Sequence, residues 1–302
     1  MKRVDNFGLT EASEKSHDLF VITPDLFDHW HGSLGSRQQN WLNAQNFVAK
    51  SGATMCLPDH DGHIDLAIGI IDEPYIWAGA KLSSTLPKAV WDLQIYKSCI
   101  DNDQLGTLAL GWGLANYSFD QCRDKEKTPL NQLICPKTVS VSKLRGILTG
   151  TYLCRDLINL PSNYLTPAEL ETTARQLAAT HQANITVYQG DQLATSFPAI
   201  HTVGRAAETG PRLIDLRWGT IGPKITLIGK GITFDSGGLD LKPSKAMEMM
   251  KKDMGGAAIV LGLAAALMTH GTNIQLRVLI AAAENAISDR AMRPLDVIDT
   301  RA

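Results

Sequence analysis

Short apolar runs separated by turn signals fill the first part of the chain. The runs 19-LFVI and 66-LAIGII each end at a turn that contains proline, and a longer apolar stretch covers 106–119. Proline, glycine and acidic residues in such places interrupt strands and begin turns. The alternation of short strands and helices predicts a small α/β domain over residues 1–135.

A charged stretch that contains proline, 123-RDKEKTPLNQLICPKT, follows this domain and is typical of a domain boundary. Beyond it, apolar residues recur at helical spacing from Val141 to Ile158, and Pro161 ends the pattern. We therefore predict a connecting helix within residues 136–160.

The remaining part of the chain predicts a second α/β domain over residues 161–302. Thr166, Pro167 and Glu169 form the sequence pattern of a capping box at the start of a helix over 166–181. Further elements are expected as strands at 184–189, 224–231 and 274–285, and as one long helix at 245–270. Because these strands are apolar at consecutive positions, we expect a mostly parallel sheet covered by helices on both faces.

Composition restricts the possible classes of protein. The 302 residues are 44% hydrophobic and 20% charged, with a formal net charge of −2 and no long run of Lys or Arg, so a nucleic-acid or anionic-membrane surface is not expected. We read no secretory signal at the start and no run of about 18 apolar residues that would span a membrane. The five cysteines are scattered and lack a CxxC pair, which favours a cytoplasmic location and argues against disulfides or a zinc-thiolate site.

The candidate chemistry lies in 227-LIGKGITFDSGGLDLKPS-244, where a predicted strand runs into a glycine-containing loop. This stretch contains Lys230, Asp235, Asp240 and Lys242, and ligands of parallel sheets bind beyond the carboxyl ends of strands. Carboxylates at such a position are suitable ligands for divalent cations. A lysine can join them only after losing its proton, since an ammonium has no lone pair. The alternative is a pair of surface ion pairs, Lys230–Asp235 and Lys242–Asp240.

The predicted helix that follows contributes Asp253, which lies near its apolar flank beside Met254. A buried carboxylate needs a partner charge or a metal. Gly255 and Gly256 would each cost about 1 kcal/mol in a helix interior relative to alanine. The close approach of another backbone, or of a bound group, would explain them.

Three segments resemble the leucyl (cytosol) aminopeptidase family, whose members are dinuclear metallopeptidases that remove N-terminal residues from peptides. These segments are 155-RDLINLPSNYLTPAEL, 229-GKGITFDSGGLDLKPSKAMEMMKKDMGGAA and 281-AAAENAISDRAMRPLDVIDTRA. The resemblance is strong from about Ser140 onward and looser before it. It implies an N-terminal domain, a catalytic peptidase domain that begins near residue 161, and assembly of the full-length protein as a homohexamer.

The resemblance also implies roles for individual residues. Lys230 and Asp253 would bind one metal, Asp235 would bridge two divalent ions, Mn or Zn, and Lys242 would act as the electrophile beside the substrate carbonyl. Met250 falls where the family lines the pocket for the first side chain of the peptide. Asp240 has no matching role.

The chain departs from the family pattern after 293-RPLDV. Family members continue into an Asn-Thr-Asp-Ala-Glu-Gly-Arg segment that supplies two more carboxylate ligands and an arginine associated with bicarbonate, whereas this sequence ends at Ala302. We therefore expect an incomplete copy with only the N-terminal part of the catalytic domain. The alternatives are a catalytically inactive fragment, a structural or regulatory homologue, a nucleic-acid-binding protein, or part of a longer gene product.

Other polar clusters have simpler explanations. The stretch 59-DHDGHID contains His60, Asp61 and His63, but its Asp-Gly pair favours a polar turn over a metal site. The same applies to His29 and His31, which flank a tryptophan. The sequence contains no Walker A motif, no GxGxxG fingerprint and no GxSxG nucleophile motif.

Overall fold

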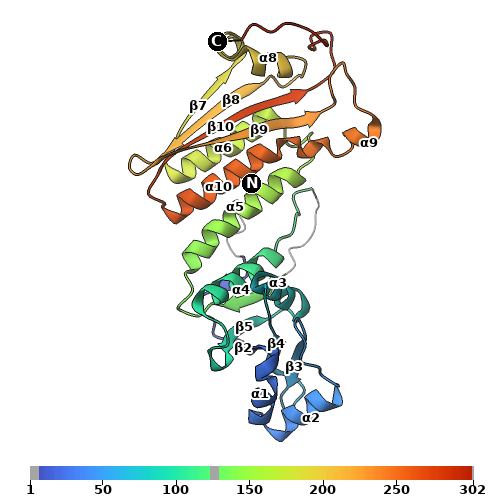
Figure 1. Ribbon diagram of the computed structural model, residues 1–302, viewed down its shortest axis with the longest axis vertical. Helices are drawn as coiled ribbons and strands as arrows, with labels where there is room; N and C mark the ends of the chain where they lie inside the picture. The colour runs from blue at the N-terminus through green and yellow to red at the C-terminus, as the bar shows by residue number, and fades with distance from the viewer. Residues whose placement is uncertain (1–6, 123–128, 301–302) are drawn as a thin grey trace. The chain divides into compact units, whose positions relative to one another are not determined.

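The computed structural model describes residues 7–122 and 129–300, which form two compact units (Figure 1). One unit contains residues 7–118 and 129–148, and the other contains 119–122 and 149–300. Helix α5, Val141–Asn159, occupies most of the stretch predicted as a connecting helix, and it continues from one unit into the other.

The N-terminal unit contains a six-stranded sheet with the order β1-β6-β5-β2-β4-β3. All of its neighbouring strands are parallel except the antiparallel pair β3 and β4. The strands are Leu9–Thr10 (β1), His17–Ile22 (β2), Thr54–Pro58 (β3), Ile64–Ile70 (β4), Val90–Ile95 (β5) and Gln132–Ile134 (β6). The apolar runs at 19 and 66 therefore become buried parallel strands, and the predicted α/β class is confirmed for this unit.

The helices of the N-terminal unit pack around tryptophans. Trp30, Trp91 and Trp112 are almost completely buried. Helices α3 and α4 lie so close that a Cβ at Gly79 would overlap the carbonyl oxygen of Leu108. The helical segments are Pro24–Leu26 (η1), Phe27–Ser33 (α1), Ser36–Ala44 (α2), Tyr75–Thr85 (α3), Tyr96–Ser98 (η2) and Asn102–Ala115 (α4).

The C-terminal unit contains a four-stranded sheet with the order β7-β8-β10-β9. Helices α6 and α10 lie along one face of this sheet and α8 lies on the other, as predicted (Figure 1). The elements are Pro167–His181 (α6), Asn184–Gln189 (β7), Gly190–Ser196 (α7), Pro198–Gly204 (α8), Arg212–Trp218 (β8), Lys224–Asp235 (β9), Ser244–Met247 (α9), Met250–Met254 (η3), Gly255–His270 (α10) and Gln275–Asn285 (β10).

The strand directions in this sheet differ in part from the expectation of a mostly parallel sheet. The predicted crossover pair β9 and β10 is parallel, but β10 with β8 and β8 with β7 are antiparallel. Strand β8 is the strand of this sheet that was not predicted from the sequence. Its charged residues at Arg212, Asp215 and Arg217 interrupt the apolar run that would have marked it as a strand.

The helix predicted over 245–270 is divided into α9, η3 and α10. Gly255 and Gly256 are consequently the first residues of α10 rather than interior residues, and the assumption that they weaken a continuous helix is wrong. By length and composition alone Ser244–His270 could cross a membrane. Its α10 part, however, contributes buried residues such as Ala258, Leu261 and Ala265 to the core of this unit.

The start of α10 packs directly on β9 because both elements carry glycine at the crossing. A Cβ at Gly229 would lie 2.7 Å from the Cα atom of Ala257 and 2.9 Å from its backbone nitrogen. A Cβ at Gly256 would lie 3.1 Å from the backbone nitrogen of Lys230. The close approach of another backbone therefore explains Gly256. Gly255 has more room, since its Cβ would meet only Ile158, at 3.9 Å.

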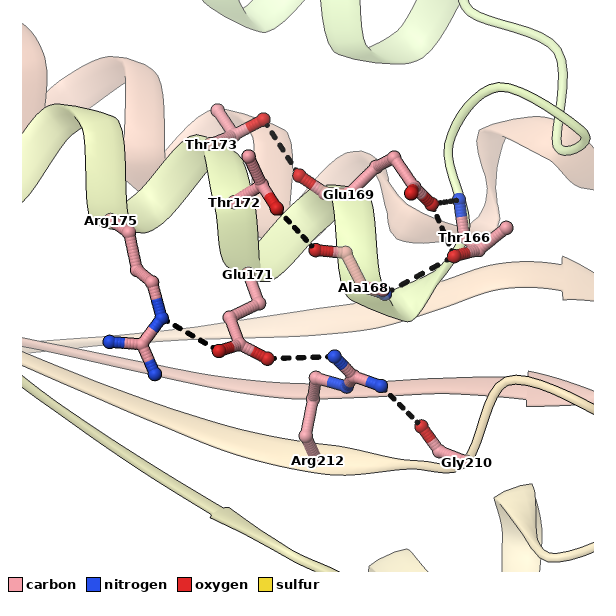
Figure 2. A network of polar contacts seen from close by, with 9 residues as sticks. All are labelled: Thr166, Ala168, Glu169, Glu171, Thr172, Thr173, Arg175, Gly210 and Arg212. Carbon is pink, nitrogen blue, oxygen red and sulfur yellow. Dashed lines mark hydrogen bonds and ion pairs between the residues drawn. The ribbon is translucent and has the colours of Figure 1, made fainter.

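Helix α6 begins with the predicted capping box (Figure 2). The Thr166 side chain accepts a hydrogen bond from the Ala168 amide, and Glu169 accepts one from the Thr166 amide. One turn later, Glu171 accepts hydrogen bonds from Arg175 and from Arg212 of β8, each at 2.7 Å. The box fixes the start of α6, and Glu171 connects the helix to the sheet.

Asp215 of β8 is the most buried charged group of the sheet, with 3% of its surface exposed. Arg217 and Arg277, which are register partners on β8 and β10, both donate through two nitrogens to its carboxylate at 2.8 to 3.2 Å. Burial acts to raise the pKa of Asp215, but the hydrogen bonds from the two arginines outweigh it and hold that pKa below its usual value.

We predict that Asp215→Asn lowers the free energy of unfolding by about 1–3 kcal/mol, because charge-assisted hydrogen bonds are replaced by weaker ones in a buried place. Urea unfolding monitored by circular dichroism measures this change. Asp289→Asn makes the same substitution at an exposed position of the same unit and should leave stability nearly unchanged. Equal midpoints for wild type and Asp215→Asn would contradict the prediction.

The difference in stability between wild type and Asp215→Asn should also depend on pH. The folded pKa of Asp215 is depressed, so its contribution is fully present above the unfolded value of about 3.9 and is lost as pH falls through the folded pKa. The stability difference between wild type and Asp215→Asn should therefore be constant from neutral pH to about pH 5 and shrink below about pH 4. A constant difference down to the acid limit of folding would contradict this assignment.

We also predict that Gly229→Ala lowers the free energy of unfolding by about 1–3 kcal/mol, because the added methyl group forces α10 away from β9. Gly210→Ala is the matched control, since no atom lies within 4 Å of the Cβ position there. The urea midpoint should fall for Gly229→Ala alone. If both variants unfold at the same midpoint, the packing of α10 on β9 is not the constraint described here.

Candidate metal centre

The candidate residues lie on β9, on the loop after it and on η3. Strands β9 and β10 are parallel, so Asp235 and Asn285 end them at the same edge of the sheet. Figure 1 shows the chain leaving this edge, passing through α9 and returning toward the sheet at the start of α10. This path brings η3, which follows the loop, alongside β9.

Lys230 of β9 pairs with Asp253 of η3, with 2.7 Å between Lys230 Nζ and Asp253 Oδ2. The Asp253 side chain is only 17% exposed, whereas that of Lys230 is 60% exposed. Within the residues that the structure describes, Asp253 Oδ2 is buried and accepts no hydrogen bond of regular geometry, so the Lys230 ammonium is its charged neighbour. A buried carboxylate oxygen in this condition is suited to bind a cation directly.

Asp235 is held differently, because its two carboxylate oxygens have separate partners. Oδ1 accepts hydrogen bonds from the Asn285 side-chain amide at 2.8 Å and from the Gly237 backbone amide at 2.9 Å. Oδ2 lies 3.0 Å from Lys242 Nζ. Burial acts to raise the pKa of Asp235, but the hydrogen bonds from Lys242, Asn285 and Gly237 outweigh it and lower that pKa, so the carboxylate is ionised at neutral pH.

The loop after β9 is closed by glycines in left-handed conformations. Gly237 has φ +91° and Gly238 has φ +68°. A Cβ at Gly237 would overlap the carbonyl oxygen of Asp240 and would lie 2.9 Å from the backbone nitrogen of Lys242. That nitrogen donates to the Ser236 carbonyl at 3.0 Å. The tight turn therefore returns Lys242 to Asp235, which explains why glycines stand between the charged residues.

The structure pairs the charged residues differently from the surface alternative. Lys230 pairs with Asp253 and Lys242 pairs with Asp235, so the predicted ion pairs Lys230–Asp235 and Lys242–Asp240 are wrong. The expected partner of Lys242, Asp240, is an exposed loop residue. Lys230 and Asp253 meet because η3 returns along β9, and the spacing of charges within the loop does not reveal this contact.

Met250 is the first residue of η3 and is partly exposed, three positions before Asp253.

Asn285 and Ser236 are the site residues that sequence reasoning missed. The Ser236 amide and hydroxyl both donate to the Asn285 carbonyl, at 3.1 and 2.7 Å. The signal that could have found Asn285 is its place at the end of the strand 274–285, which was predicted to run parallel to the strand bearing Lys230.

The turn at Asp59–His63 and the side chain of His29 lie on the polar surface. Asp59 Oδ1 accepts hydrogen bonds from the amides of Asp61 and His63, both at 2.9 Å, as expected for the predicted turn. Ligand atoms of Asp59, Asp61 and His63 lie within 4.8 Å of one another on the exposed surface. His29 contacts Tyr96 and Lys97 instead of a metal-ligand group.

Lys230, Asp235 and Asp253 together fit part of a divalent metal site. Two carboxylates supply hard oxygen ligands, and Asp253 Oδ2 lacks a hydrogen-bond donor. Each carboxylate faces a lysine ammonium, so positive charge already occupies the position beside it. Within residues 7–122 and 129–300, no further His, Cys, Asp or Glu gathers with these carboxylates into a group of three.

Comparison with known proteins identifies the family of both domains. The catalytic-domain model of the cytosol aminopeptidase family matches residues 152–302, and the model of the M17 aminopeptidase N-terminal domain matches residues 18–136. A probable cytosol aminopeptidase of Thermosynechococcus vestitus is 41% identical over 167 residues, which are 54% of this chain and 34% of the relative.

Solved structures resemble nearly the whole chain. A cytosol aminopeptidase from Coxiella burnetii superposes with a TM-score of 0.89 and 38% identity, over 97% of this chain and 64% of that one. The bottromycin maturation enzyme BotP in complex with Mn superposes with a TM-score of 0.78 and 28% identity, over 94% and 62%.

The chain matches only part of the length of its curated relatives. The chain spans between 32% and 59% of the length of the curated relatives that it matches. Both domains of the fold and the segment that carries Lys230, Asp235 and Asp253 lie inside the matched regions. The sequence, the fold and the relatives therefore agree that this chain belongs to the cytosol aminopeptidase (M17) family.

Proposed function

We propose that this chain takes part in metal-dependent aminopeptidase chemistry, the hydrolytic release of N-terminal residues such as leucine from peptides. The observation that carries the proposal is the buried Asp253 oxygen beside Lys230, on a strand that ends at Asp235, in a chain of the cytosol aminopeptidase family. A buried polar atom without a regular hydrogen bond is uncommon in folded proteins, and a bound ion or water is one of its explanations.

Lys230, Asp235 and Asp253 are the proposed metal ligands, with Lys230 and Asp253 on one ion and Asp235 between two. Asp253 would bind through Oδ2, which accepts no regular hydrogen bond among the described residues. Asp235 would bind through Oδ2, because its partner there, Lys242, is a flexible side chain that can move aside. A divalent Mn or Zn ion bound there would supply Lewis acidity toward a peptide carbonyl and an acidified water. Mn is supported by the bound ion of the BotP relative.

Lys242 is the proposed electrophile. Its side chain is 30% exposed, so it is partly desolvated and its ammonium is held 3.0 Å from Asp235 Oδ2. A positive charge fixed beside the reacting carbonyl stabilises the oxyanion that forms there. Met250, on the same side of the chain as Asp253 along η3, is proposed to line the pocket for the first side chain of the peptide.

A second candidate is a chain that binds metal or peptide without turnover. A peptide with a free N-terminus as substrate, a homohexamer and a cytoplasmic location belong to the same proposal. With a formal charge of −2, nucleic-acid binding is the least supported role.

Hydrolysis of leucine p-nitroanilide separates the two candidates. The purified 302-residue chain is assayed with added Mn²⁺ or Zn²⁺, and the bound metal is counted by mass spectrometry. Turnover that needs the added metal supports the aminopeptidase proposal. Metal bound in stoichiometric amount without turnover would support the non-catalytic candidate for this chain.

We predict that Asp235→Ala weakens Mn²⁺ binding by at least about tenfold, because an ionised carboxylate ligand is lost. Titration with Mn²⁺, followed by the electron paramagnetic resonance signal of free Mn²⁺, measures the affinity. Where wild type shows turnover, this variant should lose it.

Asp240→Ala is the matched control, since it removes an exposed aspartate from the same loop. Its Mn²⁺ affinity should remain within about twofold of wild type, because an exposed surface charge that is not a metal ligand contributes little. If both aspartate variants bind Mn²⁺ as wild type does, the assignment of Asp235 as a ligand is wrong.

A further inference from the structure

Asn285 stands at the point where the register of β9 and β10 changes. The pairing runs regularly from Gln275 with Lys224 to Ala283 with Ile232, and the next pair is Asn285 with Asp235. Strand β9 therefore has one more residue than β10 in this last step, which is a β-bulge. Bulges redirect the side chains that follow them and occur next to active sites.

The bulge brings the side chains of Asn285 and Asp235 together. Asn285 Nδ2 donates to Asp235 Oδ1 at 2.8 Å. Since an ionised carboxylate only accepts hydrogen bonds, the amide must present its NH₂ group to it. The Gly237 amide donates to the same oxygen at 2.9 Å. Asp235 Oδ1 is thus fixed by two donors of the protein, whereas among the described residues the partner of Oδ2 is the Lys242 ammonium.

Asn285 is itself held firmly. Its carbonyl oxygen accepts from both the amide and the hydroxyl of Ser236, which is 8% exposed. Its Oδ1 lies against Gly238, where a Cβ would approach it to 2.9 Å. The backbone of Asn285 therefore anchors the loop, and its side chain remains available to orient the Asp235 carboxylate.

We infer that Asn285 is a positioning residue for metal binding, which acts through Asp235 by fixing the plane of its carboxylate and directing Oδ2 toward the bound ion. This inference rests on the proposed metal-binding role of Asp235. Outer groups that hydrogen-bond to a carboxylate ligand fix its orientation, and their loss typically weakens metal binding 10- to 100-fold. Because the anchoring contacts of Asn285 are made by its backbone, they survive replacement of the side chain.

The test compares Mn²⁺ affinity in wild type, Asn285→Ala and Asn285→Gln, with urea midpoints measured on the same samples. Asn285→Ala should raise the Mn²⁺ dissociation constant about 10- to 100-fold in chains that remain folded. Asn285→Gln keeps the amide donor on a side chain one methylene longer and should recover part of that affinity. A purely structural role predicts a lower urea midpoint without a selective loss of Mn²⁺ affinity.

The outcomes separate this inference from the proposed function. If wild type binds Mn²⁺ and Asn285→Ala binds it equally well, the positioning role is overturned and the metal site stands. An equal loss in Asp240→Ala, which leaves the contact between Asn285 and Asp235 intact, would indicate general loosening of the loop and would also overturn it. If wild type binds no Mn²⁺, the proposed metal site fails, and the positioning role fails with it.

Discussion

The crossing of α10 over β9 is the constraint on which the candidate site depends. Gly229 and Gly256 lack side chains at the place where the two backbones meet, and a methyl group at Gly229 would be too close to Ala257. Because η3 leads directly into α10, this packing also fixes the position of Asp253 beside Lys230. The backbone contact between β9 and the start of α10 thus determines that Lys230 meets Asp253. The pairing of these two charges therefore follows from the contact of two backbones at glycine positions.

The parallel pairing of β9 and β10 supplies the second half of the site. Parallel strands end at the same edge, so Asp235 and Asn285 meet there although 50 residues separate them. The antiparallel strands β8 and β7 extend the sheet away from this edge, and Asp215 with its two arginines connects β8 to β10 there. The charged network of β8 therefore connects the strands of the sheet, while Lys230, Asp235, Lys242 and Asp253 are the charges of the candidate site. The two groups differ, because each Asp215 oxygen accepts hydrogen bonds from two arginines, whereas Asp253 Oδ2 faces the single ammonium of Lys230 among the described residues.

Local sequence signals were sufficient where a structure depends on neighbouring residues. Thr166, Pro167 and Glu169 predicted the start of α6, and the run 184–189 matched β7 residue for residue. Signals failed where the structure depends on distant residues. Strand β8 mixes apolar residues with charges whose partners include Arg277 of β10 and Glu171 of α6, so its sequence alone resembles a polar segment. Likewise, the ion pair of Lys230 with Asp253 joins β9 to a 3₁₀ turn 23 positions later, which the sequence presented as part of one long helix. The family resemblance named these two residues together as ligands of one metal, whereas the local spacing of charges suggested partners within the loop.

The lysines explain how such a site is compatible with a stable fold. Asp253 and Asp235 are 17% and 18% exposed, and an ionised carboxylate in such surroundings is unfavourable unless a positive charge lies close to it. Lys230 and Lys242 provide that charge from long side chains whose nitrogens can move several ångströms with little rearrangement of the backbone. In the proposed metal site, a divalent ion on these carboxylates would take over the same electrostatic role, and Lys230 would contribute its nitrogen as a ligand once it has lost its proton. Arginine could not do this, since its guanidinium keeps its charge and offers no lone pair. The pairing of each of these carboxylates with lysine rather than arginine, in contrast to Asp215, is therefore compatible with the proposed exchange of a protein cation for a metal.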